Sequence, residues 1–225
     1  MKKLKVITLG LCAALVLSCS TKTGTGALIG AGAGTFVGGV IGKIAGNTAV
    51  GAAVGAAVGA GTGALIGKHM DKVKAETEAQ LDNAKVEEVT DANGLKAVKV
   101  TFDSGILFAL NKADLNATSK SELAKFSSVL KNNNTCSVDI QGYTDSTGND
   151  GINIPLSQQR AEAVSNYLKS CGVSSNQIVK VQGYGSANPV ADNSTKAGQA
   201  LNRRVEVYLY ASQDMINAAN NGTLQ

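Results

Sequence analysis

The hexapeptide Val138-Asp-Ile-Gln-Gly-Tyr143 is nearly repeated as Val179-Lys-Val-Gln-Gly-Tyr184. In both copies apolar residues occupy alternate positions, which is typical of a strand with one buried face. The stretch from Gln158 to Ser170 lies between them and places its apolar residues on one face of a helix. Two parallel strands joined by such a helix form a right-handed βαβ unit. The repeat therefore predicts a parallel strand pair inside an α/β domain.

Other segments extend this unit along the chain in both directions. Ser119-Lys-Ser-Glu122 has the spacing of a capping box, which predicts a helix that continues to Leu130. Ser157 is the predicted N-cap of the helix in the βαβ unit. A short helix is expected at 195–201, and alternating apolar residues predict strands at 96–102, 136–142, 178–183 and 204–210.

The loops after the two parallel strands span residues 144–155 and 185–194. Both open on the same edge of the sheet, where the ligand sites of open α/β sheets gather. We therefore expect a binding site at this edge, close to the start of the helix that follows Ser157.

Three motifs at this edge resemble the OmpA-like peptidoglycan-binding domain, as found in lipoproteins of the peptidoglycan-associated type. They are Thr144-Asp145-Ser-Thr-Gly148, Asn153-Ile-Pro-Leu156-Ser157-Gln-Gln-Arg160-Ala161 and Asn202-Arg203-Arg204-Val205-Glu206. The resemblance covers about residues 96–211. It implies a βαβαβ sandwich with a mixed sheet, and a binding protein that is not an enzyme and needs no cofactor.

In that family the ligand is the diaminopimelate side chain of the wall peptide, whose free end carries an ammonium and a carboxylate. The resemblance assigns Asp145 to the ammonium and Arg160 to the carboxylate, which a guanidinium can hold through two charge-assisted hydrogen bonds. Arg160 is expected in the first turn of its helix, where free N–H groups also favour an anion. The alternative for Asp145 and Arg160 is that they form an ion pair with each other and bind no ligand. Arg204 and Glu206 are expected to form a separate, structural pair at the last strand. The remaining positions that match the pocket are Asn111, Thr147, Asn153 and Arg203.

The sequence departs from the family pattern at two positions. Tyr143 stands where a histidine is common, so a histidine-dependent pH effect is not expected. Gln199 stands where an arginine is usual, which leaves the positive charge of the pocket to Arg160 and Arg203.

Residues 1–18 have the plan of a secretory signal peptide, with a basic start, a short apolar run and small residues at the end. Val16-Leu17-Ser18-Cys19 resembles the bacterial lipobox, in which the cysteine is acylated and begins the mature chain. Residues 19–23 would then be the lipidated N-terminus, anchored by more than the two hydrophobic signals that stable binding needs. In such lipoproteins an aspartate after the cysteine favours the inner membrane, so Ser20 predicts the outer membrane. Ser20-Thr21-Lys22 also lacks the acidic cluster that directs some lipoproteins to the cell surface, which predicts a periplasm-facing protein.

Glycine recurs at every fourth position from Gly26 to Gly46 and again from Gly51 to Gly67. Each glycine in an exposed helix costs about 1 kcal/mol relative to alanine. Rows of glycine are therefore best explained by close packing between helices. We expect residues 24–67 to form a helical hairpin that resembles the glycine-zipper segments of envelope proteins. Three alternatives remain open: a hairpin in or against a membrane, a periplasmic zipper that forms a homo-oligomer, and a flexible spacer.

The segments on either side of the predicted domain look less ordered. Residues 68–95 are rich in charge and predict a solvated connector, in which Met70, Val73 and Thr77 have a loose helical spacing. Residues 212–225 are expected to be a C-terminal tail.

The four cysteines separate into two groups. Cys12 leaves with the signal peptide and Cys19 carries lipid, so Cys136 and Cys171 remain in a compartment that permits disulfides. The helix of the βαβ unit returns to the start of the first strand, which predicts a Cys136–Cys171 disulfide. Two buried free thiols are the alternative.

The composition excludes several classes of function. The net charge of +4 is too small for a nucleic-acid-binding face, and a 4% aromatic content without Trp argues against binding by base stacking. With one histidine and no nucleophile paired with a base, neither a metal site nor a hydrolase is expected. Two hypotheses remain. The chain tethers the outer membrane to peptidoglycan, or it is a zipper-based assembly protein that wall binding only positions.

Overall fold

The computed structural model describes residues 58–103, 107–108 and 111–224. The predicted signal peptide, Cys19 and the glycine rows up to Gly55 lie outside the described residues. The described helices and strands, in chain order, are α2 (Ala60–Gln80), β1 (Ala84–Thr90), β2 (Lys96–Asp103), α4 (Ala117–Asn132), β3 (Cys136–Gly142), α5 (Asp150–Ser170), β4 (Ile178–Gly183), α6 (Lys196–Asn202), β5 (Arg204–Ala211) and α7 (Gln213–Asn220).

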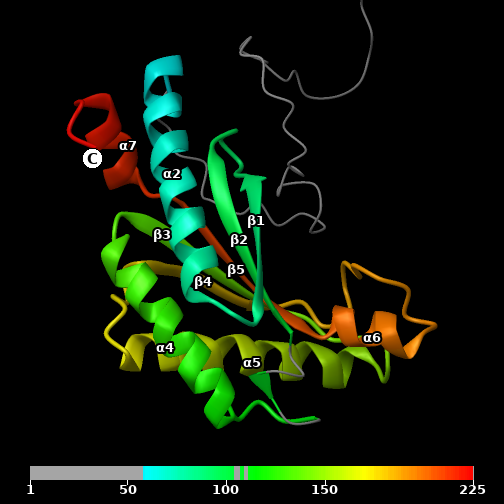
Figure 1. The fold of residues 1–225 in the computed structure, drawn as a ribbon. Coiled ribbons are helices and arrows are strands. Elements are labelled where there is room, and N and C mark those ends of the chain that lie inside the picture. The colour runs from blue at the N-terminus through cyan, green and yellow to red at the C-terminus, as the bar shows by residue number, and fades with distance from the viewer. Residues whose placement is uncertain (1–57, 104–106, 109–110, 225) are drawn as a thin grey trace, which may run out of the picture. The chain divides into compact units, whose positions relative to one another are not determined.

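The strands form one mixed sheet in the order β1-β2-β5-β3-β4. β3 and β4 are parallel, with Ile140 opposite Val181. β5 lies antiparallel to both β3 and β2, and β1 lies antiparallel to β2. α5 connects β3 to β4 and packs against both strands (Figure 1). The predicted parallel pair, the mixed sheet and the α/β class are therefore confirmed.

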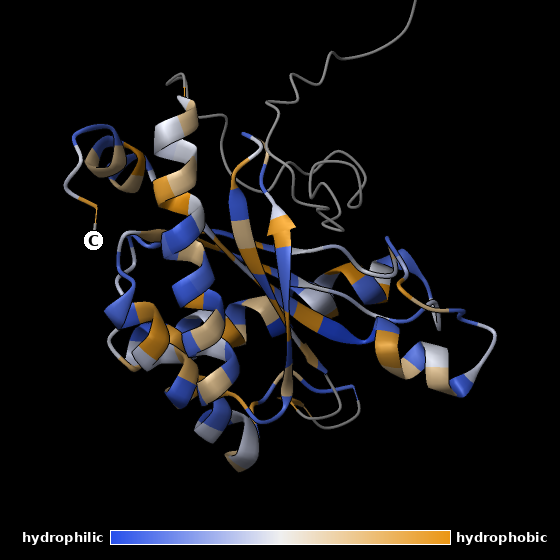
Figure 2. Ribbon diagram, turned by 45° about the horizontal axis from the view of Figure 1, so that its top comes forward, coloured by the Kyte–Doolittle hydropathy of each residue, from blue (hydrophilic) through white to orange (hydrophobic). Residues whose placement is uncertain are grey.

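The hydrophobic core lies between this sheet and the helices. Side chains of α2, α4, α5 and α7 meet alternate residues of the strands there, such as Val100 and Ile140. Figure 2 shows the matching alternation of apolar and polar residues along the strands. Phe102 of β2 meets Phe126 of α4 edge-on, with ring centroids 5.7 Å apart. Because helices from both ends of the described chain share this core, they belong to one folded unit.

α2 is part of this folded unit, so the prediction of a solvated connector is wrong. Met70, Val73 and Thr77 have the predicted helical spacing, but all three are buried. The helix begins at Ala60, within the predicted glycine hairpin, so the boundary expected at residue 68 lies inside one continuous helix. None of the helices in the described part of the chain is long and apolar enough to cross a membrane.

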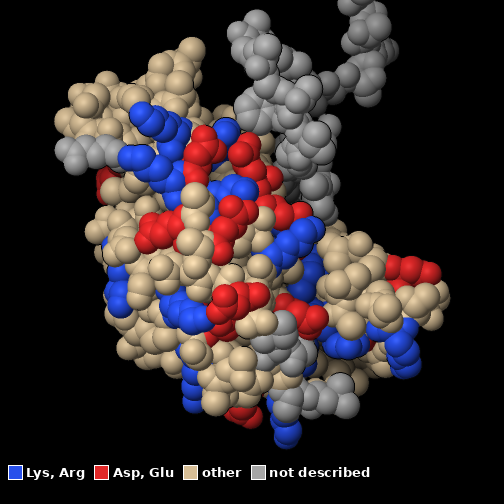
Figure 3. Space-filling model, viewed as in Figure 1, with Lys and Arg blue, Asp and Glu red and all other residues tan. Residues whose placement is uncertain are grey.

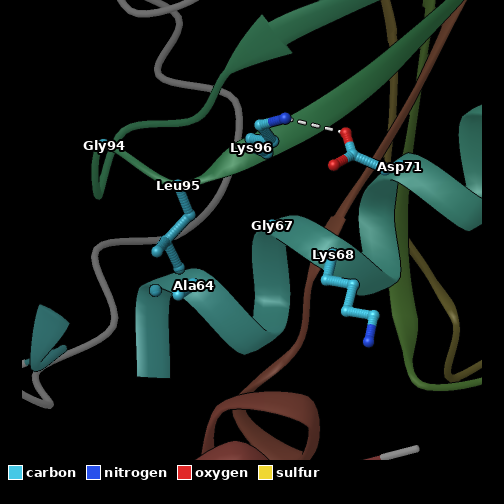
Figure 4. Close-up of a pocket in the computed structure, with 8 residues that line it drawn as sticks. Ala64, Gly67, Lys68, Asp71, Gly94, Leu95 and Lys96 are labelled. Atoms are coloured by element: carbon cyan, nitrogen blue, oxygen red, sulfur yellow. Dashed lines mark hydrogen bonds and ion pairs between the residues drawn. The ribbon is translucent and has the colours of Figure 1, made fainter. Parts of the chain in front are cut away.

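The last glycines of the repeat face a strand hairpin. A groove of about 380 Å³ separates the start of α2 from the β1–β2 turn, and Gly63 and Gly67 line it (Figure 4). A Cβ atom on Gly67 would lie 3.5 Å from the side chain of Lys96. Lys96 in turn forms an ion pair with Asp71 of α2 at 2.7 Å. At these two positions the neighbour of the glycine row is a β-hairpin and not a second helix.

Two predicted borders of the domain are also wrong. β1 lies within the predicted connector, yet it pairs with β2 along its whole length. α7 lies within the predicted tail, yet it buries Met215 and Ile216 in the core. The folded unit therefore starts well before residue 96 and continues past residue 211.

α4 begins slightly earlier than predicted, at Ala117. Its N-cap is Asn116, whose side chain accepts a hydrogen bond from the Ser119 N–H at 2.9 Å. The predicted capping box is absent, because Glu122 instead accepts a hydrogen bond from the backbone N–H of Asp82. Glu122 thus ties α4 to the segment that joins α2 and β1.

α5 begins a full two turns earlier than predicted and contains Pro155. Ser157 is therefore not its N-cap. The Ser157 hydroxyl accepts a hydrogen bond from the Gly185 N–H at 2.8 Å and so joins α5 to the loop after β4. Arg160 lies roughly three turns into the helix, so the prediction that it sits among free N–H groups of the first turn is wrong.

The two glycines of the sequence repeat lie side by side where α5 crosses the sheet. Gly142 of β3 is paired with Gly183 of β4. A Cβ atom on Gly142 would lie 2.1 Å from the carbonyl oxygen of Ser157, and one on Gly183 would lie 2.2 Å from the backbone nitrogen of Gln158. Only glycine permits this approach of the helix backbone to the sheet, and the approach brings α5 beside the ends of the strands.

The predicted Cys136–Cys171 disulfide is wrong, because both thiols are free. The Cys136 sulfur is buried beneath α2, 3.9 Å from the sulfur of Met70. Cys171 is the partly exposed C-cap of α5.

Thiol labelling should distinguish these two cysteines. Burial raises the pKa of Cys136 to about 12, and the thiolate is the reactive form. In a chain that starts at residue 20, we expect a maleimide to modify Cys171 within minutes and Cys136 only after unfolding. Mass spectrometry of the native and denatured protein checks this. Equal labelling of both thiols in the native state would contradict the buried position of Cys136.

Candidate functional site

A cavity of about 320 Å³ opens where β3 ends and α5 begins, with α6 on its far side. All six residues predicted for the pocket line it, although they come from four separate segments of the chain. They are Asn111, Asp145, Thr147, Asn153, Arg160 and Arg203.

Asp145 is the anionic group of this pocket. Its Oδ2 atom lies 2.6 Å from Nη1 of Arg203, and its Oδ1 atom accepts a hydrogen bond from the Thr147 N–H at 2.8 Å. Burial on its own raises the pKa of Asp145, but the hydrogen bonds from Arg203 and Thr147 outweigh burial and hold the pKa below its ordinary value. Asp145 is therefore ionised at neutral pH, and its ion-pair partner is Arg203 and not Arg160.

Arg160 is a buried cation, 3% exposed, with unused hydrogen-bonding capacity. Its Nε atom donates to the carbonyl oxygen of Lys112 at 3.0 Å, and its guanidinium lies 5.3 Å from the ring centroid of Phe108. Nη1 is buried and makes no hydrogen bond within the described residues. Burial, and then the charge of Arg203, lower its pKa. A buried donor without an acceptor is costly, so this atom would be stabilised by a hydrogen-bond acceptor.

Asn153 and Thr147 shape the loop that carries Asp145. The Asn153 amide nitrogen donates to the carbonyl oxygen of Thr147 at 3.0 Å, and the Asn153 side chain is buried. Asn111 also lines the cavity, with a φ of 56° in the left-handed region that asparagine tolerates better than most residues. The bond between Asn153 and Thr147 therefore holds the loop that carries Asp145 against α5.

The motif Asn202-Arg203-Arg204 serves three separate purposes. The side-chain Oδ1 atom of Asn202 accepts hydrogen bonds from the backbone N–H groups of Val190 and Ala191, and these bonds hold the loop after β4 in place. Arg203 binds Asp145. Arg204 points away from the pocket and pairs with Glu206 at 2.7 Å, with both side chains buried, so the predicted structural pair is confirmed.

The comparison with known proteins agrees with this geometry. The model of the OmpA family matches residues 107–203, which supply every residue of the cavity. The chain contains an OmpA-family domain. A second family model, the YMGG-like Gly-zipper, matches residues 1–71 and so covers the glycine repeat.

Relatives of the OmpA-family domain are envelope proteins. The chain is 44% identical to the probable lipoprotein YiaD of Escherichia coli over 110 residues, which cover 49% of this chain and 47% of that protein. It is 43% identical to the peptidoglycan-binding protein ArfA of Mycobacterium tuberculosis over 111 residues, which cover 49% of this chain and 34% of ArfA. The matched region thus spans less than half the length of either relative.

A solved structure supports the same fold. The cell wall anchor of the type VI secretion system (T6SS) from Pseudomonas aeruginosa superposes with a TM-score of 0.51 and 26% identity. The superposition covers 64% of this chain and 97% of that one.

Tyr143 lies outside the pocket of the OmpA-family domain. It is buried on the other face of the sheet, where its ring stacks on Tyr184 with centroids 5.5 Å apart. The guanidinium of Arg204 covers the ring at 3.8 Å from its centroid, and the Tyr143 hydroxyl donates to Gln141. The departure from histidine at this position therefore changes the support of the sheet and not the lining of the cavity.

Sequence reasoning missed several residues that line the pocket of the OmpA-family domain. Lys196 of α6 is one of them, and it lies three positions before Gln199, which also lines the cavity. Residues three apart share a helix face, so this spacing could have revealed Lys196. The others could not be recognised by spacing alone: they are Thr144, Ile152 and Leu156.

The electrostatics of the domain predict how ligand binding depends on pH. The pKa of Asp145 is lowered, so its carboxylate stays charged through the ordinary aspartate range. Its pairing with a cation is lost only as the pH falls through the lowered pKa of the folded protein. No histidine lines the cavity in the described part of the chain. We expect binding to be constant from pH 8 to pH 5 and to decline only below the ordinary aspartate pKa of about 3.9. A titration midpoint near pH 6.5 in a binding assay would contradict this assignment.

Proposed function

We propose that this protein binds peptidoglycan without covalent attachment, through the free end of a diaminopimelate side chain. Asp145 receives the ammonium and Arg160 receives the carboxylate. The observation that carries this proposal is that Arg160 lines the same cavity as an ionised aspartate, while its buried Nη1 atom makes no hydrogen bond within the described residues. The peptidoglycan-binding relative ArfA supports the same class of ligand.

The ion pair between Asp145 and Arg203 is compatible with this role. A carboxylate offers about four lone-pair sites, and the hydrogen bonds from Arg203 and Thr147 use only some of them. An incoming ammonium can therefore share the carboxylate with Arg203, which keeps the anion in place before the ligand arrives.

We further propose that the protein is an outer-membrane lipoprotein that faces the periplasm. Acylation of Cys19 would anchor it, and Ser20 favours the outer membrane. The lipobox-like sequence before Cys19 supports this placement, as does the relative YiaD, a probable lipoprotein. With the pocket on the wall, the chain would act as a tether between outer membrane and peptidoglycan, without catalysis. Among the described residues, no three His, Cys, Asp or Glu side chains are grouped to hold a metal ion.

Co-sedimentation with purified sacculi tests the proposed function. A chain from residue 20 onward should pellet with diaminopimelate-containing sacculi, and millimolar free meso-diaminopimelate should release it into the supernatant. The fraction of protein that pellets without sacculi is the background, to which self-association through the glycine-rich segment contributes. The proposal fails if sacculi do not raise the pelleted fraction. It fails equally if meso-diaminopimelate releases no more protein than cadaverine, which has two ammonium groups but no carboxylate.

A second candidate function rests on the Gly-zipper match to residues 1–71. In this alternative the glycine segment inserts into a membrane or forms a homo-oligomer, and wall binding only positions it. Deletion of residues 24–57 separates the two functions and leaves α2 intact. Wall binding should persist, while any oligomer seen by analytical ultracentrifugation should be lost. An oligomer of unchanged size after this deletion would exclude the zipper as the assembly element.

A further inference from the structure

The charge in the pocket is unbalanced. Four ionisable side chains line the cavity: one is an anion, Asp145, and three are cations, Arg160, Lys196 and Arg203. Arg203 and Asp145 neutralise each other at 2.6 Å. Within the described residues, neither Arg160 nor Lys196 has an ion-pair partner.

A zwitterionic ligand does not correct this imbalance, because its two charges cancel. Its ammonium is matched by Asp145 and its carboxylate by Arg160, which leaves Lys196 and the shared charge of Arg203 beside the same cavity. The volume of about 320 Å³ lies within the range of roughly 300–1,000 Å³ of pockets that hold small molecules. The cavity thus has room for part of the residue next to the zwitterionic group.

The family pattern has an arginine at position 199, where this chain has Gln199. Lys196 lies about one helical turn before that position and supplies a cation there instead. The Gln199 side chain is tied to the loop before α6 by a hydrogen bond from its Nε2 atom to the carbonyl oxygen of Asn193 at 2.9 Å. α6 itself is packed tightly, since a Cβ atom on Gly198 would lie 2.0 Å from the carbonyl oxygen of Asp192. The helix therefore presents Lys196 to the cavity from a fixed backbone.

We propose that this pocket selects wall peptides with a second free carboxylate, on the residue that precedes diaminopimelate, and that Lys196 recognises it. The inference rests on the proposed function and specifies its substrate class. Amidation of that carboxylate removes its negative charge. It also places the N–H donors of an amide next to the ammonium of Lys196, which is itself a donor. The attraction is between exposed charges, so it weakens as salt rises.

Calorimetric titration with two synthetic tripeptides tests the inference. Both have the sequence L-Ala-γ-D-Glu-meso-diaminopimelate, and they differ only in a carboxylate or a carboxamide at the glutamate α-carbon. The wild-type chain from residue 20 should prefer the acid by roughly two- to fivefold at low ionic strength, the range of an exposed ion pair. Lys196→Gln should bind both peptides equally, with the affinity for the amide unchanged, and Lys196→Arg should keep the preference.

Lys169→Gln is the matched control, because it removes the same charge from an exposed position in the last turn of α5. It should retain the full preference for the acid. Equal binding of both peptides by the wild type, or an undiminished preference in Lys196→Gln, would overturn the inference about Lys196 and leave the proposed function standing. Failure of the wild type to bind either peptide would overturn this inference together with the proposed function.

Discussion

Arg160→Met should reduce the affinity for diaminopimelate-containing peptide about 100-fold, the size of loss expected when one partner of a buried charge pair is removed. The ligand carboxylate would then face a hydrophobic side chain that offers it no hydrogen-bond donor. The free energy of unfolding should fall little or even rise, because the substitution removes a buried, only partly bonded charge. Loss of binding without loss of stability is the signature of a ligand-binding residue.

Calorimetry with the acidic tripeptide and urea unfolding of the same preparations provide the two measurements. Asp145→Asn should show a comparable loss of affinity, because the ammonium loses its anion. Asp114→Asn is the matched control, since Asp114 is exposed and does not line the cavity. If Arg160→Met binds as well as the wild type, the carboxylate does not reach Arg160 and the proposed orientation of the ligand is wrong.

Gly142→Ala should destabilise the fold by about 3 kcal/mol or more. The new methyl group would meet the carbonyl oxygen of Ser157 at 2.1 Å, and both atoms belong to backbone that neighbouring elements hold in place. Relief of this clash requires α5 to move off the sheet. That movement also displaces Asn153 and Arg160, so peptide binding should decrease together with the free energy of unfolding.

Gly61→Ala is the matched control for this substitution. A Cβ atom on Gly61 meets no atom within 4 Å, and the residue lies in the first turn of α2. Alanine favours a helix over glycine by up to about 1 kcal/mol, so the same chemical change should here be neutral or stabilising. If Gly142→Ala unfolds at the same urea concentration as the wild type, the close contact between β3 and α5 does not exist in solution.

The sequence predicted the centre of the fold well, because the residues there follow simple periodic rules. The bounds of β3 and β4 agree with the predicted strands, and in β3 the alternating Val138 and Ile140 lie in the core as expected. β1 was missed for the opposite reason. It is an edge strand whose charged residues form ion pairs, such as Glu87 with Lys99 at 2.8 Å, and edge strands commonly carry charges.

The candidate site was predicted from motifs, while its internal pairing came only from the structure. All six predicted residues line one cavity. The structure, however, pairs Asp145 with Arg203 and not with Arg160. α5 begins before Pro155, so Arg160 lies deeper in the helix than it would if Ser157 were the N-cap. A proline in the second turn removes only one helical hydrogen bond, and the packing of Gly142 and Gly183 against this helix compensates for the loss.

The position of α2 determines how the fold responds to mechanical tension. The first turns of α2 and α7 lie at one end of the sheet, and α6, beside the pocket, lies at the other (Figure 1). In a chain held by an N-terminal anchor and a wall-bound pocket, a pulling force enters the described fold at Gly59. Charged side chains lie over part of the outer surface of α2 (Figure 3). Its buried side chains, beginning with Ile66, would be extracted one turn at a time. Such sequential peeling requires less force than simultaneous rupture of the whole core, so α2 would be the first described element to detach.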